Sequence, residues 1–194
     1  STYQLTGNPY AGSTDPYSAG NGSMMRLAPV VLFYFPDGER VREFSIESSR
    51  TTHGASEAIE CCQVLAECIA NALRGASKTQ VLQVGYLALS EPKVASIAGG
   101  HSLEKARSEI VGSGYAVASL EAALWCFHHT DSFAEAVLMA ANLGDDADTT
   151  AAIVGQLAGA YYGVQGIPVE WLGKLWQRDD IQATADSLLN RLRD

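Results

Sequence analysis

The sequence predicts an all-α fold, a compact domain built from many helices, and three observations lead to this prediction. Residues 53–74 carry apolar side chains three or four positions apart, the spacing of an amphipathic helix. Residues 148–163 carry glycines at intervals of four, which places them along one face of a helix. No segment alternates apolar and polar residues as a half-buried strand does. We therefore expect the 194 residues to form a single domain around one core.

The first half of the chain opens with a loop rich in glycine, proline, serine and aspartate, which continues to Gly20. Residues 23–35 are almost continuously apolar, which fits a buried helix or a buried strand, and we favour the helix. A turn at 36–38 closes this segment, and we expect a polar connection after it. The helix at 53–74 follows, with Gly75 just past its end as a C-cap.

The second half begins with weaker helical patterns. Residues 81–89 and 103–110 are helical candidates, separated by a break at Pro92 and at Gly99-Gly100. Residues 115–127 place four apolar side chains on one side of a helix, and a capping-box pattern at 132–135 predicts the start of another.

Three glycines, Gly155, Gly159 and Gly163, form the stripe along the helix predicted at 148–163. Each glycine inside a helix costs about 1 kcal/mol relative to alanine, so the stripe indicates that another helix approaches closely. Pro168 suits the first turn of a helix, and residues 181–192 predict a final helix whose end is marked by Arg191 and Arg193.

Composition excludes several classes of function. The chain has 13 Lys+Arg against 22 Asp+Glu, a formal charge of -9, so its field repels nucleic-acid backbones and we expect no nucleic-acid partner. No apolar run approaches the roughly 20 residues that cross a bilayer, so we expect no membrane segment. The four cysteines lack the spacing of a zinc site or a disulfide framework. We expect them to be reduced core residues in a cytoplasmic protein.

The segment 142–150 concentrates the residues that carry chemistry. Three carboxylates, Asp145, Asp146 and Asp148, and two hydroxyls, Thr149 and Thr150, stand directly before the glycine-striped helix. Hard oxygen ligands of this kind select Mg²⁺, Mn²⁺ or Ca²⁺ over soft metals. The alternative is that these side chains cap the helix and interact with its dipole.

This segment, together with the glycine stripe and Ile167-Pro168, resembles the C-terminal metal motif of the ADP-ribosylglycohydrolase family. The family pattern is Gly-Gly-Asp-x-Asp-Thr, so Asp145 stands where a second glycine is usual. The resemblance implies an all-α fold in which Asp146, Asp148 and Thr149 are ligands of a centre of two magnesium ions, with manganese as the alternative metal. It also implies that Asp146 and Asp148 are the catalytic residues.

Residues 18–29 are similar to the ADP-ribose loop of the same family, which implies substrate contacts for Ser18, Gly20, Asn21 and Gly22. Glycines let backbone amides approach a diphosphate, and the start of a helix favours its charge. The alternative is an ordinary Asn-Gly turn with a serine N-cap.

Two further matches imply substrate contacts. His53, in a Thr-His pair that the family places at a helix start, can hydrogen-bond a ribose or a phosphate; alone, it reads as a surface or capping residue. The loop Gly112, Ser113, Gly114 and Tyr115 matches a family loop whose glycines line the pocket. Tyr115 can pack near the nucleotide or serve as a core aromatic.

The resemblance implies a hydrolase that cleaves the glycosidic bond between ADP-ribose and a modified protein or a small acceptor. An upstream Thr-Asp-Asp-Thr motif, which supplies the remaining metal ligands in the family, does not occur before Ser18. The chain also opens on Ser1 without a methionine, so we expect a domain that is incomplete at its N-terminus. A non-catalytic ADP-ribose-binding or structural relative is the alternative.

Overall fold

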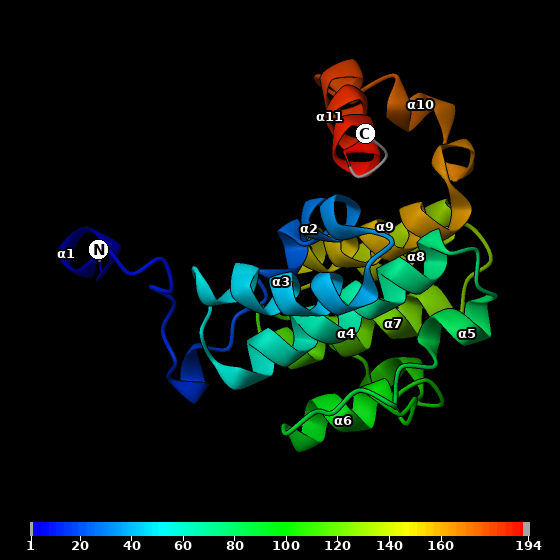
Figure 1. Ribbon diagram of the computed structural model, residues 1–194. Helices are drawn as coiled ribbons and strands as arrows, with labels where there is room; N and C mark the ends of the chain where they lie inside the picture. Colours follow the sequence, from blue (N-terminus) through cyan, green and yellow to red (C-terminus); the bar gives the residue numbers. More distant parts are fainter. Residues whose placement is uncertain (1, 192–194) are drawn as a thin grey trace.

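Helix α4 (Ser56–Leu73) is the central element of the computed structural model, which describes residues 2–191. It packs against α2, α3, α5, α6, α7 and α9, and most of its residues are buried (Figure 1). The other α-helices are α1 (Thr2–Thr6), α2 (Ala28–Tyr34), α3 (Gly38–Arg50), α5 (Lys78–Leu82), α6 (Pro92–Ala98), α7 (Ala116–His128), α8 (Phe133–Ala141), α9 (Ala147–Tyr162), α10 (Val169–Leu172) and α11 (Arg178–Asn190). Short 3-10 helices are η1 (Pro16–Ser18), η2 (Met24–Arg26), η3 (Arg107–Glu109) and η4 (Val164–Gly166).

The all-α prediction is confirmed, since residues 2–191 contain isolated β-bridges, at 13 with 53 and at 20 with 115, but no strand. The predicted helices at 53–74, 115–127 and 148–163 are α4, α7 and α9. The apolar segment 23–35 is helical, as η2 followed by α2. Helix α4 ends in a Schellman motif: Ala76 N donates to Asn71 O, Gly75 N donates to Ala72 O, and Gly75 has a φ of 78°.

The polar connection predicted after the turn at 36–38 is wrong, because this stretch forms α3. Asp37 caps the helix by accepting hydrogen bonds from the amides of Glu39 and Arg40. The buried face of α3 carries Val41, Ser45 and Ser49, so small polar residues occupy two positions where an apolar stripe is expected. Their size lets α3 pack against α4 although the sequence reads as polar.

The two weaker helices are also misplaced. Instead of 81–89, the helix is α5, which starts earlier at a capping box made by Ser77 and Gln80. The predicted break at Pro92 is the start of α6, because proline fits the first turn of a helix. Residues 103–110 contain only η3, and the carbonyl of Lys105 accepts from the indole of Trp125 rather than from a helical amide.

Helix α8 covers the glycine stripe of α9. A Cβ atom added at Gly155 would lie 3.8 Å from Val137 Cγ2, and one added at Gly159 would lie 3.8 Å from Phe133 Cε2. These are ordinary van der Waals distances, so the stripe accepts a helix at side-chain contact and the approach is less tight than predicted. Gly163 lies beyond α9 with a φ of 70°, which ends the helix.

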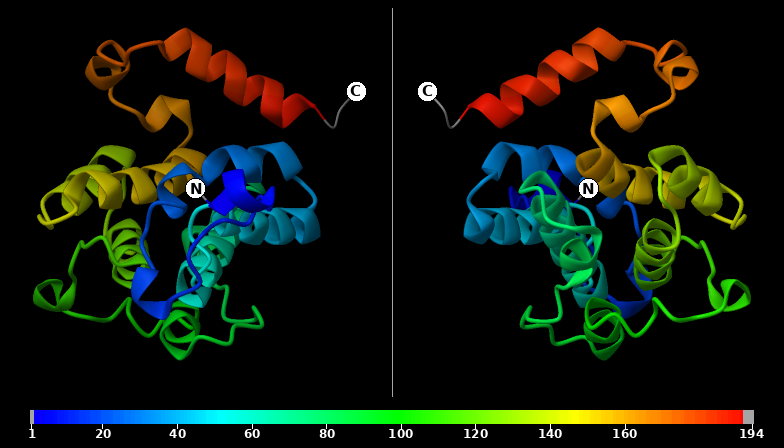
Figure 2. Two further views of the ribbon diagram at one scale, coloured as in Figure 1. Left: turned by 90° about the vertical axis from the view of Figure 1, so that its left-hand side faces the viewer. Right: turned by 90° about the vertical axis from the view of Figure 1, so that its right-hand side faces the viewer.

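The final helix, predicted at 181–192, is α11, which lies beyond α9 at the surface and packs against α2 (Figure 2). None of its described residues is buried, and the Arg191 guanidinium lies 4.4 Å from the centre of the Phe33 ring. The predicted end at Leu192 and Arg193 lies outside the described residues.

The core fills the space between α4, α7 and α9 and contains all four cysteines as free thiols, as predicted. Burial raises the pKa of Cys68 to about 12 and that of Cys126 to about 12, so these thiols are packing groups rather than nucleophiles. No helix among residues 2–191 combines the length and the apolarity that a membrane crossing requires.

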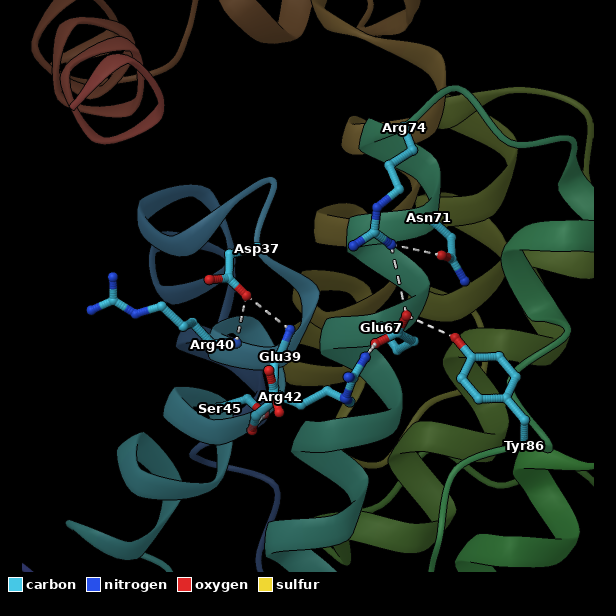
Figure 3. Close-up of polar contacts among 9 residues, drawn as sticks. All are labelled: Asp37, Glu39, Arg40, Arg42, Ser45, Glu67, Asn71, Arg74 and Tyr86. Carbon is cyan, nitrogen blue, oxygen red and sulfur yellow. Dashed lines mark hydrogen bonds and ion pairs between the residues drawn. The ribbon is translucent and has the colours of Figure 1, made fainter. Parts of the chain in front are cut away.

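A buried carboxylate fastens one end of α4. Glu67 Oε2 lies 3.1 Å from Arg42 of α3, and its Oε1 lies 3.7 Å from Arg74 and accepts a hydrogen bond of 2.7 Å from Tyr86 (Figure 3). We call these four residues the Glu67 cluster. It joins α3, the end of α4 and the segment between α5 and α6.

Candidate functional site

The buried side chain of Asn21 lies where three loops meet. Its Nδ2 atom is 2.7 Å from Asp146 Oδ2, 2.8 Å from Ser119 Oγ and 3.2 Å from the Ser113 carbonyl oxygen. Its backbone amide donates to the Gly114 carbonyl at 3.0 Å. Asn21 therefore ties the predicted substrate loop at 18–23 to the loop at 112–115 and to the carboxylate motif. We call Asn21, Ser113, Ser119 and Asp146 the Asn21 cluster.

Backbone pairing fixes these loops against one another. Gly20 and Tyr115 form an isolated antiparallel bridge, and the amide of Ala116 donates to the Ala19 carbonyl at 2.9 Å. The amide of Asp146 donates to the Gly112 carbonyl at 3.2 Å. Residues far apart in the chain are thus held in register before any ligand is bound.

A side chain at Gly112 would press on the carboxylate motif. A Cβ atom there would lie 3.1 Å from Thr150 Oγ1 and 3.4 Å from the Gly144 carbonyl, tighter than most real contacts. The hydroxyl of Thr150 donates to the Asp146 carbonyl, which leaves Thr150 as a structural residue of the first turn of α9. The 112–115 loop can therefore lie directly on the carboxylate motif.

Asp146, at the start of α9, is partly exposed and its carboxylate accepts the hydrogen bond from Asn21. That bond, with a second from Thr149, lowers the pKa of Asp146, because both partners favour the charged form. Asp148 is exposed, and its Oδ1 accepts from the amide of Thr149 at 2.9 Å. The structure thus brings Asp146, Asp148 and Thr149 together at the start of α9.

Asp145 has a φ of 54°, a left-handed conformation in which glycine is favoured and aspartate is tolerated. This backbone requirement accounts for the glycine that the family pattern has at this position. Gly144 before it has a φ of 80°, so two consecutive residues turn the chain into α9. This stretch places Asp146 and Asp148 at the start of α9.

The donor set of Asp146, Asp148 and Thr149 consists of hard oxygens, which fits magnesium or manganese. The set is partial. Within residues 2–191, no group of three or more His, Cys, Asp or Glu side chains is close enough together to hold a metal ion. Asp146 and Asp148 can therefore contribute to a metal centre, and further ligands have to complete it.

His53 lies in the turn between α3 and α4 rather than inside a helix. Its ring occupies the space beside the glycines of the 18–23 loop: a Cβ atom at Gly22 would lie 2.8 Å from His53 Cε1, and one at Gly20 would lie 3.3 Å from His53 Nε2. The Nδ1 atom is 2.9 Å from the Thr52 hydroxyl, so Nε2 is the nitrogen on the side of the loop. A side chain at Gly22 would displace the imidazole, and one at Gly20 would press on it.

Burial, and then the positive charge of Arg26, lower the pKa of His53. The imidazole is therefore neutral at pH 7, with one nitrogen able to donate and the other able to accept. Arg26 also bonds Thr52 Oγ1 at 2.9 Å and the Ser48 carbonyl at 3.2 Å, which holds the turn that presents His53. Sequence reasoning missed this role of Arg26.

Ser18 is placed differently from the other predicted contacts. Its hydroxyl donates to the Asp15 carbonyl at 2.6 Å, which closes the small turn of η1. The structure therefore does not bring the Ser18 side chain into the Asn21 cluster. Gly20 and Gly22 lie against His53, and Gly114 lies near Asp146, where a Cβ atom would be 3.8 Å from Oδ2.

A pocket of about 470 Å³ lies beside these loops and includes Tyr115 in its wall. Its lining residues are Pro16, Tyr17, Ser56, Glu57, Glu91, Lys93 and Tyr115. Of these, only Tyr115 was a predicted site residue. Ser119 and Glu57 were also missed, although each lies four residues after a predicted residue, Ser119 after Tyr115 and Glu57 after His53.

Comparisons with known proteins show which family the chain resembles. The sequence profile of the ADP-ribosylglycohydrolase family matches residues 2–194. The chain is 44% identical over 182 residues to the ADP-ribosylarginine hydrolase Tri1 of Pseudomonas putida, covering 94% of this chain and 49% of that protein. It is 30% identical over 182 residues to the ADP-ribosyl-[dinitrogen reductase] glycohydrolase of Rhodospirillum rubrum, covering 91% of this chain and 59% of that protein.

A solved structure described as an ADP-ribosylglycohydrolase-related protein complex superposes with a TM-score of 0.88 at 43% identity. The match covers 97% of this chain and 65% of the chain in that structure. The present chain thus spans about half the length of the Pseudomonas putida relative.

Proposed function

The chain belongs to the ADP-ribosylglycohydrolase family, and we propose that it forms part of an enzyme that hydrolyses the glycosidic bond between ADP-ribose and a modified acceptor. The observation that carries the proposal is the bond between Asn21 and Asp146. It joins the loop that resembles an ADP-ribose site to the carboxylates that resemble a metal site. A binding loop and a reactive group are thereby held at one place, as catalysis requires.

The substrate we propose is an ADP-ribosylated protein or a small ADP-ribosyl compound. Because the Pseudomonas putida relative is named an ADP-ribosylarginine hydrolase, ADP-ribosylarginine is the first acceptor linkage to test. The chain's charge of -9 also suits a cationic acceptor side chain better than a nucleic acid.

In this proposal the 18–23 loop and His53 hold the nucleotide. Glycines at 20 and 22 leave backbone amides accessible, and the neutral imidazole of His53 can bond a ribose hydroxyl or a phosphate oxygen. The 112–115 loop adds Ser113, Gly114 and the ring of Tyr115. These contacts position the distal ribose toward Asp146.

Asp146, Asp148 and Thr149 are the residues that would hold magnesium. When bound, the metal supplies positive charge that orients ribose hydroxyls and lowers the pKa of a water molecule. The Asp146 carboxylate is kept ionised by Asn21, so it is ready to hold a cation. We propose that residues 1–194 act as one domain and that the remaining ligands come from another polypeptide segment or from a partner.

A second candidate is a protein that binds ADP-ribose without hydrolysing it. The incomplete set of metal ligands within residues 2–191 favours this candidate. Both candidates share the nucleotide loops, so they differ in the chemistry at Asp146 and Asp148 alone.

The test incubates the chain, together with the segment or partner that completes its metal ligands, with an ADP-ribosylarginine peptide, with and without Mg²⁺, and measures free ADP-ribose. The enzyme reading predicts release that requires Mg²⁺ and that Asp148→Asn abolishes. Binding of ADP-ribose without any release, in the presence of Mg²⁺, would favour the binding protein. Release that persists in chelator, or in Asp148→Asn, would contradict the proposed role of these carboxylates.

A further inference from the structure

The hydroxyl of Tyr115 is fully engaged by two side chains that no sequence motif singled out. It donates a hydrogen bond of 2.5 Å to Glu57 Oε2 and accepts one of 2.9 Å from Lys93 Nζ. Lys93 Nζ also lies 3.4 Å from Glu57 Oε1 and 5.2 Å from the centre of the Tyr115 ring. The phenol, the carboxylate and the ammonium therefore form a closed triangle of contacts.

The three residues come from three helices that meet at the site. Glu57 is in the first turn of α4, Lys93 is near the start of α6, and Tyr115 is the N-cap residue of α7. These helices pack on one another in pairs, so the triangle connects elements already fixed by the fold (Figure 1). At its backbone, Tyr115 pairs with Gly20 of the substrate loop.

We propose that Glu57 and Lys93 are positioning residues that hold the Tyr115 ring as a wall of the nucleotide site, an inference that rests on the proposed function. With its oxygen occupied as donor and acceptor, the phenol has no remaining hydrogen for a substrate. Tyr115 lines the pocket of about 470 Å³ together with Tyr17, and in this proposal it contributes the face of its ring. A flat apolar face at a fixed angle suits packing against a planar or ribose group.

An ordinary surface ion pair would not hold the Tyr115 ring in place. The side chain of Lys93 is 66% exposed, and an exposed pair with Glu57 alone contributes little because solvent screens it. The Tyr115 hydroxyl between the two charges changes the outcome, because both charged groups then hydrogen-bond to the hydroxyl of a side chain that is partly buried. His53 lies in the turn that leads into α4, and Glu57 lies in the first turn of α4, so the same end of α4 carries both residues.

The experiment measures ADP-ribose binding by isothermal titration for the wild type, Glu57→Gln, Lys93→Met, Tyr115→Phe and the double variant Glu57→Gln/Tyr115→Phe. Each single change should weaken binding about three- to tenfold, the size of one ordinary hydrogen bond. The double variant should bind no more weakly than Tyr115→Phe, because the phenylalanine has already released the ring from Glu57. Lys93→Arg should recover most of the affinity.

Lys105→Met is the matched control, since Lys105 forms an ion pair of 2.6 Å with Glu121 that does not involve Tyr115. It should bind ADP-ribose like the wild type. A readout without ligand uses protein labelled with ¹³C in its tyrosine rings. The Tyr115 signal, identified by its loss in Tyr115→Phe, should move in Glu57→Gln and Lys93→Met and stay in place in Lys105→Met.

The outcomes separate this inference from the function on which it rests. If the wild type binds ADP-ribose and Asn21→Ala weakens binding, while Glu57→Gln and Lys93→Met bind normally, the positioning role alone is wrong. Independent losses in the double variant would also overturn it. If the wild type binds no ADP-ribose, the proposed function fails and the positioning role falls with it.

Discussion

The Glu67 cluster and the Asn21 cluster are both partly buried polar groups built around a carboxylate, yet they differ in what faces that carboxylate. Glu67 faces two arginines and a tyrosine, so its charge is matched by cations of the protein (Figure 3). Asp146 accepts hydrogen bonds from neutral donors, Asn21 first and Thr149 second. It keeps its charge and can offer it to a cation from solution.

This difference distinguishes a polar cluster that stabilises the fold from a polar cluster that can bind a ligand. Glu67 is 3% exposed and connects helices, so its bonds serve the stability of the fold. Asp146 is partly exposed at the start of α9, and the loops around it are held by backbone pairing that does not involve its carboxylate. Changes at Glu67 should therefore affect unfolding, and changes at Asp146 should affect ligands.

The largest effect is expected for Asp146, the carboxylate that faces no cation of the protein, and it concerns Mg²⁺ affinity. Asp146→Asn keeps the size of the side chain but removes its charge, so Mg²⁺ affinity in the presence of ADP-ribose should fall by at least about 100-fold. Calorimetric titration with MgCl₂ measures this, and the melting temperature should change little. Unchanged Mg²⁺ affinity would show that Asp146 does not bind the metal. The contrast between the Asn21 cluster and the Glu67 cluster would then be wrong.

A smaller effect, on the free energy of unfolding, is expected in the Glu67 cluster. Glu67→Ala leaves Arg42 and Arg74 facing each other and deprives Tyr86 of its acceptor. Both arginine side chains are about one-third exposed, 34% and 35%, so water relieves part of the loss. We expect the free energy of unfolding to fall by about 1–3 kcal/mol.

Urea unfolding of Glu67→Ala measures this change, and ADP-ribose binding of the folded protein serves as its control. Equal affinity in the wild type and in Glu67→Ala is the expected control result. A loss of affinity without a loss of stability would show that the two clusters are not separate in function.

The smallest effect concerns the pH dependence that His53 adds. Its pKa in the folded protein lies below the ordinary value of 6.5, so the unfolded chain binds a proton first as the pH falls. The stability that neutral His53 contributes is therefore complete above about pH 6.5 and is lost as the pH falls toward the folded-state pKa. His53→Gln should lose stability less steeply between pH 7 and pH 5.

His128 also has a lowered pKa, caused by burial and by the charges of His129 and Lys78. The slope must therefore be taken as the difference between wild type and His53→Gln, measured by thermal unfolding at each pH. Identical slopes in the two proteins would show that His53 is not held neutral by its surroundings.

The sequence allowed the main helices to be predicted where the local pattern and the tertiary environment agree. Residues 53–74 carry a wide apolar face, and α4 is buried on most of its surface. Helix α3 was missed because Ser45 and Ser49 occupy its buried face, so the packing of small polar side chains overrides the hydrophobic pattern. Helix α6 was missed because Pro92 can start a helix as well as interrupt one.

The candidate site was predicted through family resemblance more than through spacing. Asn21, His53, Ser113 and Asp146 are far apart in the chain, and backbone pairing between loops brings them together. No periodic pattern reports such pairing. Glu57 and Lys93 carried no motif, because their importance depends on where α4 and α6 meet Tyr115. The roles of the predicted site residues remain predictions for the experiments above.

The central claim is that the Asn21 cluster binds a ligand whereas the Glu67 cluster fastens the fold, and titration with ADP-ribose tests it most directly. The measurement compares the wild type, Asn21→Ala, His53→Ala and Glu67→Gln, each checked for a cooperative thermal transition. We expect ADP-ribose to bind the wild type more tightly than AMP or ribose, with at least about tenfold weaker binding in Asn21→Ala and His53→Ala. Glu67→Gln should bind normally. Wild-type affinity in folded Asn21→Ala and His53→Ala would contradict the account.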